Sequence, residues 1–280
     1  MPGSTFATGS RTRRLLAPEV IQTSAMDCGP AALKCLLQGF NIPVSYGRLR
    51  EACQTDLDGT SIDVLESMAN QLGLLAEQVM LPCEYLWLPQ AQTLPAILVV
   101  RCPDGFTHFV VVWRRLGSWL QVMDPATGRR WVHRSRFAQE VFQHRLPVNA
   151  SDWAVWAASE ENRAVLQGRL RALGASLDQA RTLTRLDATD WYPLAALDAA
   201  ARLVGRLVNS GALRSGRRSI QLFEALYTRA LADAPGTCRV IPANCWSVMP
   251  HPDQAETLIL QGAVLLRIIG RHLPKPPLTP

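Results

Sequence analysis

Residues 27–40 read DCGPAALKCLLQGF, and this stretch has the pattern of an amphipathic helix that begins at a cysteine. Pro30 suits the first turn, because a proline there gives up no intrahelical hydrogen bond, and Asp27 or its neighbour can cap the helix. Leucines recur at helical spacing along one side, at Leu33, Leu36 and Leu37. Gly39 is a residue typical of the C-terminal end of a helix. The stretch therefore predicts a helix that buries leucines and presents Cys28 at its N-terminus.

The segments downstream predict a sheet against which such helices can pack. Residues 61–73, SIDVLESMANQLG, repeat the helical spacing and end at Gly73. Between Pro95 and Val132 the sequence changes to the β-branched runs AILVV, HFVVVW, WLQVMD and RRWV, separated by the turn-like segments CPDG, RRLGS and PATG. A short helix is expected over residues 134–145. This part of the chain predicts an α+β fold, with helices against an antiparallel sheet.

The second half of the chain differs from the first in composition and in periodicity. From about residue 160 it is rich in Arg, Ala and Leu with helical periodicity, which predicts a mostly helical domain. Its basic residues Arg202, Arg206, Arg217 and Arg218 are expected on a solvated face. Residues 257–270, TLILQGAVLLRIIG, have β-branched runs around a glycine and predict a hairpin or strand pair. We predict a flexible N-terminal segment, an α+β domain, a mainly helical accessory domain and a proline-rich linker or tail, over residues 1–18, 19–150, 151–270 and 271–280.

Composition limits the class of protein. Hydrophobic residues make up 48% of the chain and charged residues 19%, enough for a buried core and too apolar for global disorder. The net charge of +6 comes from scattered arginines and short clusters such as Arg11, Arg13 and Arg14, so no nucleic-acid partner is expected. The positive charge is better suited to a location near an anionic membrane leaflet than to nucleic-acid binding.

The cysteines do not form a recognisable framework. Seven of them are spread without regular spacing, which favours reduced thiols. Cys238, Cys245 and His251 are too loosely spaced to predict zinc, so we expect no metal and no cofactor. The first residues lack the apolar stretch of a secretory signal, and no run of about 18 apolar residues predicts a membrane span.

Four residues offer what a nucleophilic thiol needs. Cys28 stands at a helix N-terminus, where unpaired N–H groups and the helix dipole favour the thiolate. His108 opens one strand and Asp124 closes the next, so antiparallel pairing can bring a carboxylate beside an imidazole. The amide of Gln22 can fold back to donate to an oxyanion. Each residue type also has an ordinary structural role, so both interpretations stay open on residue types alone.

The order of the motifs resembles a known family. The segments QTSAMDCGPAAL, LREACQTDLDGTSIDVLESMANQLGL, HFVVV and VMDPATG resemble the bacteriocin-processing cysteine peptidase domain at the N-terminus of peptidase-containing ABC exporters. The resemblance covers residues from about 19 to 148. It implies a papain-like fold and the removal, after a double-glycine-type site, of the leader from a ribosomally made peptide, coupled to export.

The resemblance also implies residue roles. Cys28 matches the nucleophile, His108 the general base, Asp124 the residue that orients this histidine, and Gln22 the oxyanion-hole residue. None of these positions departs from the family pattern. Gly59-Thr60-Ser61 matches the loop before the family's second helix, and we expect a turn with a helix cap there.

The implied partners are a precursor peptide with a double-glycine leader and the permease and ATPase domains of an ABC exporter. Neither a membrane span nor the phosphate-loop pattern G-x-x-x-x-G-K-[ST] occurs in the sequence. A longer chain or separate proteins would have to supply those domains. The expected location is cytoplasmic, at the cytoplasmic face of the bacterial inner membrane.

Three alternative functions stay open. The chain could be a non-catalytic module that binds leader peptides at an exporter. It could be a DNA-binding regulator in which LVNSGALRSGRRS forms a turn and a basic helix. It could also be a cysteine enzyme for acyl transfer or deamidation, because the same residues do not fix the acyl acceptor. Residues 160–270 carry no motif, and the resemblance makes them an adaptor or a leader-binding accessory domain.

Overall fold

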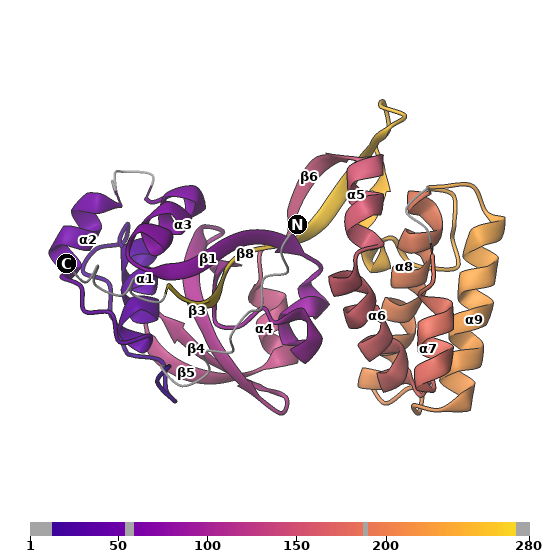
Figure 1. Ribbon diagram of the computed structural model, residues 1–280, viewed down its shortest axis with the longest axis horizontal. Coiled ribbons are helices and arrows are strands. Elements are labelled where there is room, and N and C mark those ends of the chain that lie inside the picture. Colours follow the sequence, from indigo (N-terminus) through magenta and orange to yellow (C-terminus); the bar gives the residue numbers. More distant parts are fainter. Residues whose placement is uncertain (1–12, 54–58, 187–189, 273–280) are drawn as a thin grey trace, which may run out of the picture. The chain divides into compact units, whose positions relative to one another are not determined.

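The computed structural model describes residues 13–53, 59–186 and 190–272 (Figure 1). Its helices are α1 (Cys28–Gly39), α2 (Tyr46–Ala52), α3 (Ile62–Gln71), α4 (Arg134–Glu140), α5 (Ala150–Ala157), α6 (Glu160–Leu173), α7 (Leu177–Leu183), α8 (Trp191–Asn209) and α9 (Arg217–Ala232), with short 3-10 turns η1 (Cys83–Trp87), η2 (Pro89–Ala91) and η3 (Ala243–Cys245). Its strands are β1 (Leu74–Leu81), β2 (Ala96–Arg101), β3 (Thr107–Leu116), β4 (Trp119–Asp124), β5 (Gly128–His133), β6 (His144–Asn149), β7 (Val248–Pro250) and β8 (Thr257–Arg271).

The chain forms two compact units. The first comprises Met1–Trp87, Gln92–Phe142 and Ala263–Pro280, and the second comprises Leu88–Ala91 and Gln143–Gly262. The strand order β1-β8-β2-β3-β4-β5 gives the first unit an antiparallel sheet. The predicted α+β architecture, helices against an antiparallel sheet followed by a helical region, is therefore present.

α1 covers one face of this sheet because its apolar side faces the strands. Its buried side chains Ala31, Ala32, Leu33, Cys35, Leu36 and Leu37 join Val111, Trp113 and Met123 of β3 and β4 in one cluster. Figure 1 shows α1, α2 and α3 on one side of the strands and α4 on the other. The buried leucines stabilise the fold by roughly 1.5–3 kcal/mol each through removal of apolar surface from water. The sheet thus fixes the axis of α1, and with it the direction of its N-terminus.

Gly39 ends α1 as predicted, but its role is steric. A Cβ atom on Gly39 would lie 2.1 Å from the nearest ring atom of Trp113, so only glycine allows this approach. The left-handed residue that turns the chain is Asn41, with φ of 58°. Because of this close approach, the C-terminal end of α1 packs directly against β3.

Part of the predicted flexible N-terminal segment is packed against the sheet. Residues 1–12 lie outside the described residues, whereas Ala17 is fully buried. Its N–H donates to the buried Gln121 side chain over 2.9 Å, and the Arg14 carbonyl accepts from the Trp113 indole over 3.1 Å. Residues 13–18 therefore belong to the folded unit, because hydrogen bonds between their backbone and side chains of β3 and β4 hold them.

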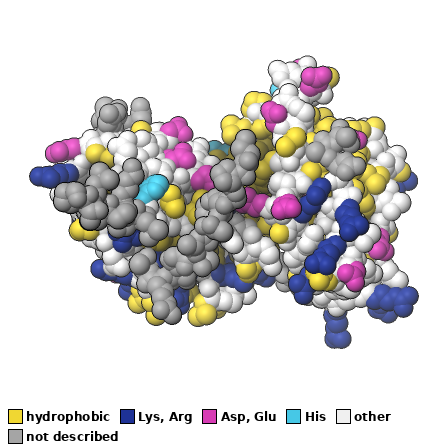
Figure 2. Space-filling model, in the orientation of Figure 1, with side chains coloured by type: hydrophobic (Ala, Val, Ile, Leu, Met, Phe, Trp, Pro, Cys, Tyr) yellow, Lys and Arg dark blue, Asp and Glu magenta, His cyan; other side chains and the backbone are white. Residues whose placement is uncertain are grey.

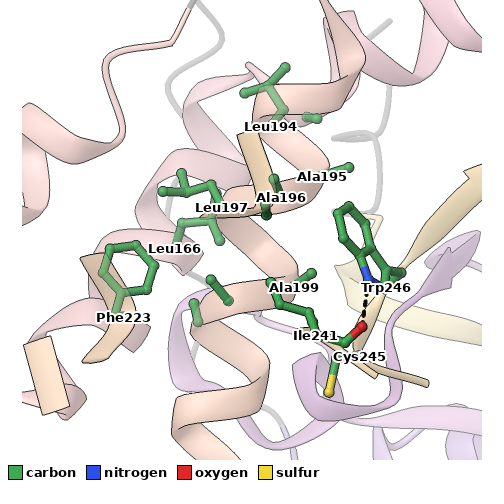
Figure 3. Packing of buried hydrophobic residues seen from close by; sticks show 14 of the residues in the cluster. Leu166, Leu194, Ala195, Ala196, Leu197, Ala199, Phe223, Ile241, Cys245 and Trp246 are labelled. Carbon is green, nitrogen blue, oxygen red and sulfur yellow. Dashed lines mark hydrogen bonds between the residues drawn. The ribbon is translucent and has the colours of Figure 1, made fainter. Parts of the chain in front are cut away.

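The second unit is a helical bundle with a small sheet. Its core centres on α8, and Figure 3 shows residues of α8 together with Leu166 of α6, Phe223 of α9 and Trp246. The Trp246 indole donates to the Ile241 carbonyl over 3.4 Å and its ring stacks on Tyr192, with centroids 5.7 Å apart. β6 and β7 both pair with the first half of β8. The prediction of a mostly helical second region is confirmed.

Two of the four arginines expected on a solvated face are less exposed than predicted: Arg206 is half-buried and donates to the Asn244 carbonyl over 2.9 Å. Arg217 and Arg218 are exposed as expected, but Arg202 is buried on α8. Arg202 and Arg169 both contact the buried carboxylate of Asp198, over 3.9 Å and 2.5 Å. A buried charge requires such partners, and Asp198 lies one turn before Arg202.

Two predicted elements have different limits in the structure. The helix expected over 134–145 ends at Glu140, because Val141 forms a bridge with Val100 and Phe142 donates to the Val99 carbonyl over 3.0 Å. Residues 144–149 form β6 instead. Residues 257–271 form one continuous strand rather than a hairpin or strand pair, because Gly262 pairs directly with His144 and makes no turn.

The continuous strand also changes the division of the chain. The predicted domain limits were residue 150 and residue 270, but Ala263–Arg271 of β8 lies between β1 and β2 of the first unit. In the register, Leu81 pairs with Ala263 and Ile97 with Leu266. The predicted tail at 271–280 lies outside the described residues except for Arg271 and His272. The first sheet therefore needs a strand from the far end of the chain.

The distribution of surface charge and the character of the helices relate to the expectations about nucleic-acid binding and membrane spans. Figure 2 shows Lys and Arg side chains spread over the visible face rather than gathered into one tract. Among the described residues, none of the helices combines the length and the apolar character needed to span a membrane.

Candidate active site

The four predicted site residues come from four places in the first unit. Cys28 is the first residue of α1, His108 is the second residue of β3, Asp124 is the last residue of β4, and Gln22 lies in the segment before α1. β3 and β4 pair antiparallel with Val111 opposite Met123, so the start of β3 lies beside the end of β4. The local sequence order predicted this approach.

His108 links the thiol to the carboxylate. Its Nε2 lies 2.9 Å from Asp124 Oδ1, and both side chains are largely buried, with exposed fractions of 11% and 13%. The Cys28 thiol interacts with the same imidazole, because each of the two groups is among the causes that shift the pKa of the other. Since Asp124 occupies Nε2, Nδ1 is the ring nitrogen that is left for the thiol. His108 therefore interacts with both Cys28 and Asp124.

Asp124 is itself held in place by the turn that follows it. Its Oδ1 accepts from the Ala126 N–H over 2.9 Å, and Gly128, with φ of 93°, closes the PATG turn back onto β5. Burial raises the pKa of Asp124, but the hydrogen bonds from His108 and Ala126 outweigh it and the pKa is lowered. The carboxylate is therefore charged at neutral pH and favours a protonated imidazole.

The pKa values of the other two groups move toward an ion pair. Burial raises the pKa of Cys28, but the hydrogen bond with His108 and the backbone N–H groups of Phe109 and Gly29 bring it below its ordinary value. Burial lowers the pKa of His108, but its hydrogen bonds with Asp124 and Cys28 raise the pKa to about 9. Both shifts favour a thiolate beside an imidazolium.

Gln22 joins the group through its backbone. Its N–H donates to the carbonyl of Pro125, the residue after Asp124, over 2.9 Å. Its side-chain Oε1 is buried and has no hydrogen-bond partner in the described part of the chain. A buried acceptor without a protein donor is costly, so this oxygen needs a donor from outside the protein. The structure thus brings all four predicted residues into one region.

The comparisons with known proteins agree on this region. Residues 17–148 match the peptidase C39 family. An uncharacterized protein of Methanothermobacter marburgensis is 31% identical over 129 residues, which are 45% of this chain and 86% of that protein. The chain belongs to the peptidase C39 family.

Other C39 relatives are parts of larger proteins. The lactococcin-G-processing and transport ATP-binding protein LagD of Lactococcus lactis subsp. lactis is 31% identical over 121 residues, 43% of this chain but 17% of LagD. A solved double glycine motif protease from an AMS/PCAT transporter, in complex with the leader peptide, is 26% identical, with a TM-score of 0.41. That alignment covers 47% of this chain and 89% of the solved chain. The C39 domain here is homologous to peptidase domains of bacteriocin-processing ABC transporters.

One residue of the C39 site has a role that the sequence did not predict. Asp27 stands at the N-cap position of α1, but its carboxylate makes no capping hydrogen bond. It is fully buried and accepts from the Thr23 hydroxyl over 2.7 Å and from Arg50 Nε over 2.9 Å. The expectation of a side-chain cap was wrong, because Arg50 of α2 and Thr23 compete for this carboxylate. The contacts anchor the segment between Gln22 and Cys28.

The helix cap predicted before α3 is present. Gly59 has φ of 84°, which favours glycine, and the Ser61 hydroxyl accepts from the Val64 N–H over 3.3 Å as a helix cap. Its neighbour Thr60 packs close to the start of α1, where a Cβ on Gly29 would lie 3.1 Å from Thr60 Cβ. The turn therefore also limits the space next to Cys28.

The other thiols differ from Cys28. Burial raises the pKa of Cys35 and raises that of Cys53 to about 11, so both stay protonated and unreactive. The pKa of Cys102 is raised by burial and by nearby Asp104 and Asp124. Among the described residues, no three His, Cys, Asp or Glu side chains are grouped as a metal site would require.

Proposed function

We propose that this chain is a cysteine endopeptidase in which Cys28 is the nucleophile, His108 the general base, Asp124 the group that orients the imidazole, and Gln22 an oxyanion donor. The observation that carries the proposal is that His108 lies 2.9 Å from Asp124 and lowers the pKa of Cys28, which stands at the N-terminus of α1. The helix dipole and the imidazolium both stabilise a thiolate at this position.

The reaction would follow from these positions. The Cys28 thiolate attacks the scissile carbonyl carbon, and the Gln22 amide and the Cys28 backbone N–H stabilise the developing oxyanion. The imidazolium of His108 then protonates the leaving amine as the peptide bond breaks, which leaves a thioester on Cys28. His108, now neutral, takes a proton from the attacking water, whose oxygen bonds to the acyl carbon as the C–S bond breaks, which releases the acid and restores the Cys28 thiolate beside a protonated His108. Asp124 holds the imidazole in the tautomer that this exchange needs.

The proposed substrate is a ribosomally made precursor peptide with a double-glycine-type leader, cut after the glycine pair. Support comes from the motif order and from relatives whose names state bacteriocin processing and leader-peptide binding. Because the match spans 17% of LagD, the substrate and the export partner of this chain are proposals. An ABC exporter permease and ATPase, in the same chain or as separate proteins, would place the peptidase at the cytoplasmic face of the membrane.

The two units would divide the work. Residues 19–150, completed by the second half of β8, would form the peptidase, and the helical second unit would act as an adaptor or accessory domain. The C39 match ends at residue 148, before the helical bundle begins. This division of labour rests on that limit and on the separate cores of the two units.

Cleavage of synthetic leader peptides tests the proposal. Peptides with Gly-Gly or Gly-Ala before a short cargo are incubated with wild type, Cys28→Ala and the matched thiol variant Cys238→Ala, and the products are weighed by mass spectrometry. We expect wild type and Cys238→Ala to cut after the glycine pair and Cys28→Ala to be inactive. Leader binding without cleavage by any of the three would instead make the chain a non-catalytic leader-binding module.

A further inference from the structure

The outer end of the β3–β5 sheet face carries exposed apolar side chains together with basic ones. We name it the Trp–Arg face, and it consists of Leu15, Leu16, Leu116, Trp119, Trp131, Arg13, Arg14, Arg114 and Arg129. The register pairs Leu116 with Trp119 and Arg114 with Gln121, and it pairs Gln121 in turn with Trp131. Directly opposed residues of antiparallel strands point to the same side, so these side chains share one surface.

Contacts join the N-terminal segment to this sheet surface. The Arg114 guanidinium lies 5.7 Å from the centroid of the Trp131 ring, and its NH1 donates to the Leu15 carbonyl over 3.2 Å. The guanidinium of Arg129 donates to the Ala17 carbonyl over 2.8 Å. Arg114 therefore joins Leu15 to Trp131, and the N-terminal segment and the strands form one face.

The apolar members of the face are unusually open to solvent. Exposed fractions are 72% for Leu15, 61% for Leu116, 51% for Trp119 and 41% for Trp131. Scattered exposed leucines need no explanation, but a contiguous group that includes two tryptophans marks an interaction surface. The mechanism proposed for Cys28 uses none of these residues.

Positive charge surrounds these apolar groups without compensation. Among the described residues, none of Arg13, Arg14, Arg114 and Arg129 forms an ion pair with a carboxylate, and the nearby Glu19 accepts only from the Arg129 backbone N–H. Arg13 and Arg114 lie close enough that Arg114 adds to burial in lowering the pKa of Arg13. Uncompensated guanidinium groups at this density would bind a surface of phosphate groups well.

We propose that the Trp–Arg face docks on an anionic phospholipid membrane. Tryptophan and leucine side chains would enter the interfacial region, where tryptophan is enriched, while the arginines meet lipid phosphates. The combination favours a lipid surface over nucleic acid, because exposed leucines gain nothing from a phosphate backbone. This inference goes beyond the proposed peptidase activity and does not depend on it.

Co-sedimentation of the full chain with vesicles tests the proposal. Vesicles of phosphatidylcholine alone are compared with vesicles that also contain phosphatidylglycerol. The variants are Leu15→Gln/Trp119→Gln, Arg13→Gln/Arg14→Gln, and the matched control Arg217→Gln/Arg218→Gln, which removes equal charge from the exposed start of α9. We expect wild type and control to bind only the anionic vesicles. Each face variant should bind the anionic vesicles with an affinity at least about tenfold lower than that of wild type.

Several outcomes would overturn the proposal. These are equal binding to both vesicle types, equal binding by the face variants, or an equal loss in the control variant. Concentration-dependent dimers that the Leu15→Gln/Trp119→Gln variant abolishes would assign the face to a second copy. Binding to duplex DNA in place of vesicles would assign it to nucleic acid.

A measurement on wild type alone covers the case in which a variant does not fold. Hydrogen–deuterium exchange is followed with and without phosphatidylglycerol vesicles. We expect slower exchange in β4, in β5 and in residues 13–18 when vesicles are present. Protection confined to other parts of the chain would contradict the proposal.

Discussion

Asp124 decides the charge state of the proposed nucleophile, although it does not touch the thiol. Its carboxylate lies 2.9 Å from His108 Nε2, and this contact is one of the causes that raise the pKa of the imidazole to about 9. A proton held on His108 in turn lowers the pKa of Cys28. Because the two groups are coupled, the ion pair exists only between the lower apparent pKa of the pair and the upper one.

Asp124→Asn tests this coupling. The pKa of His108 should fall, because the neutral amide gives up the attraction to the imidazolium, and that of Cys28 should rise in response. We expect kcat/KM for leader cleavage to fall about 100-fold and its alkaline limb, near pH 9 in wild type, to move to lower pH. The matched variant Asp178→Asn, at the exposed start of α7, should leave the profile unchanged. An alkaline limb that stays in place in Asp124→Asn would refute the role of Asp124.

The roles of single residues were predictable where they depend on local sequence. Cys28 at a helix start and Asp124 before a turn could be placed from neighbours alone. Asp27 could not, because its partner Arg50 lies 23 positions away and nothing local marks the pair. The same holds for Arg202, whose burial depends on a third side chain, Arg169, that shares its aspartate. Local patterns favour a cap and a solvated arginine, and tertiary contacts override both.

At the scale of elements, α1 is positioned by its packing against β3. Gly39→Ala should place a methyl group against the Trp113 ring, since a Cβ there would lie 2.1 Å from it. We expect a loss of about 1–3 kcal/mol in the free energy of unfolding of the first unit, measured by urea denaturation. Gly47→Ala on α2, where nothing lies within 4 Å of the added atom, should be neutral or stabilising. Equal stability of the two variants would show that α1 can shift away from β3.

The elements predicted correctly are those whose partners are close in sequence. β2, β3, β4 and β5 follow one another through short turns, so alternating β-branched runs and turn residues define them. β1, β6 and β8 pair across the length of the chain, and the Glu77–Arg267 ion pair joins residues 190 positions apart. Sequence periodicity carries no information on such pairing. The prediction of a hairpin at Gly262 was wrong for this reason.

At the scale of the whole molecule, the C39 sheet depends on a strand outside the C39 match. The family match ends at residue 148, yet Ala263–Arg271 pairs with both β1 and β2. Without this strand, the backbone N–H and C=O groups of two strands would lose their partners in the interior of the sheet. The first unit is therefore completed only by residues that follow the helical bundle.

A chain that ends at Gly262 tests this dependence. We expect it to lose the cooperative unfolding transition of the first unit and its leader cleavage, whereas a chain that ends at His272 should keep both, because it retains all of β8. Adding a synthetic peptide of residues 257–272 to the shorter chain should restore part of the activity. Full activity of the chain ending at Gly262 would show that β1 and β2 can close the sheet without β8.

The central claim is that Cys28 forms a covalent bond with the substrate during peptide cleavage. Its most direct test is acid quenching of wild-type protein within the first turnover of a Gly-Gly leader peptide, followed by digestion and mass spectrometry. The account predicts a transient thioester between the leader carboxyl group and Cys28, on the peptide that contains DCGPAAL. It also predicts no adduct on the other cysteines. Leader cleavage at full rate with no adduct on Cys28, or cleavage retained in Cys28→Ala, would contradict the account.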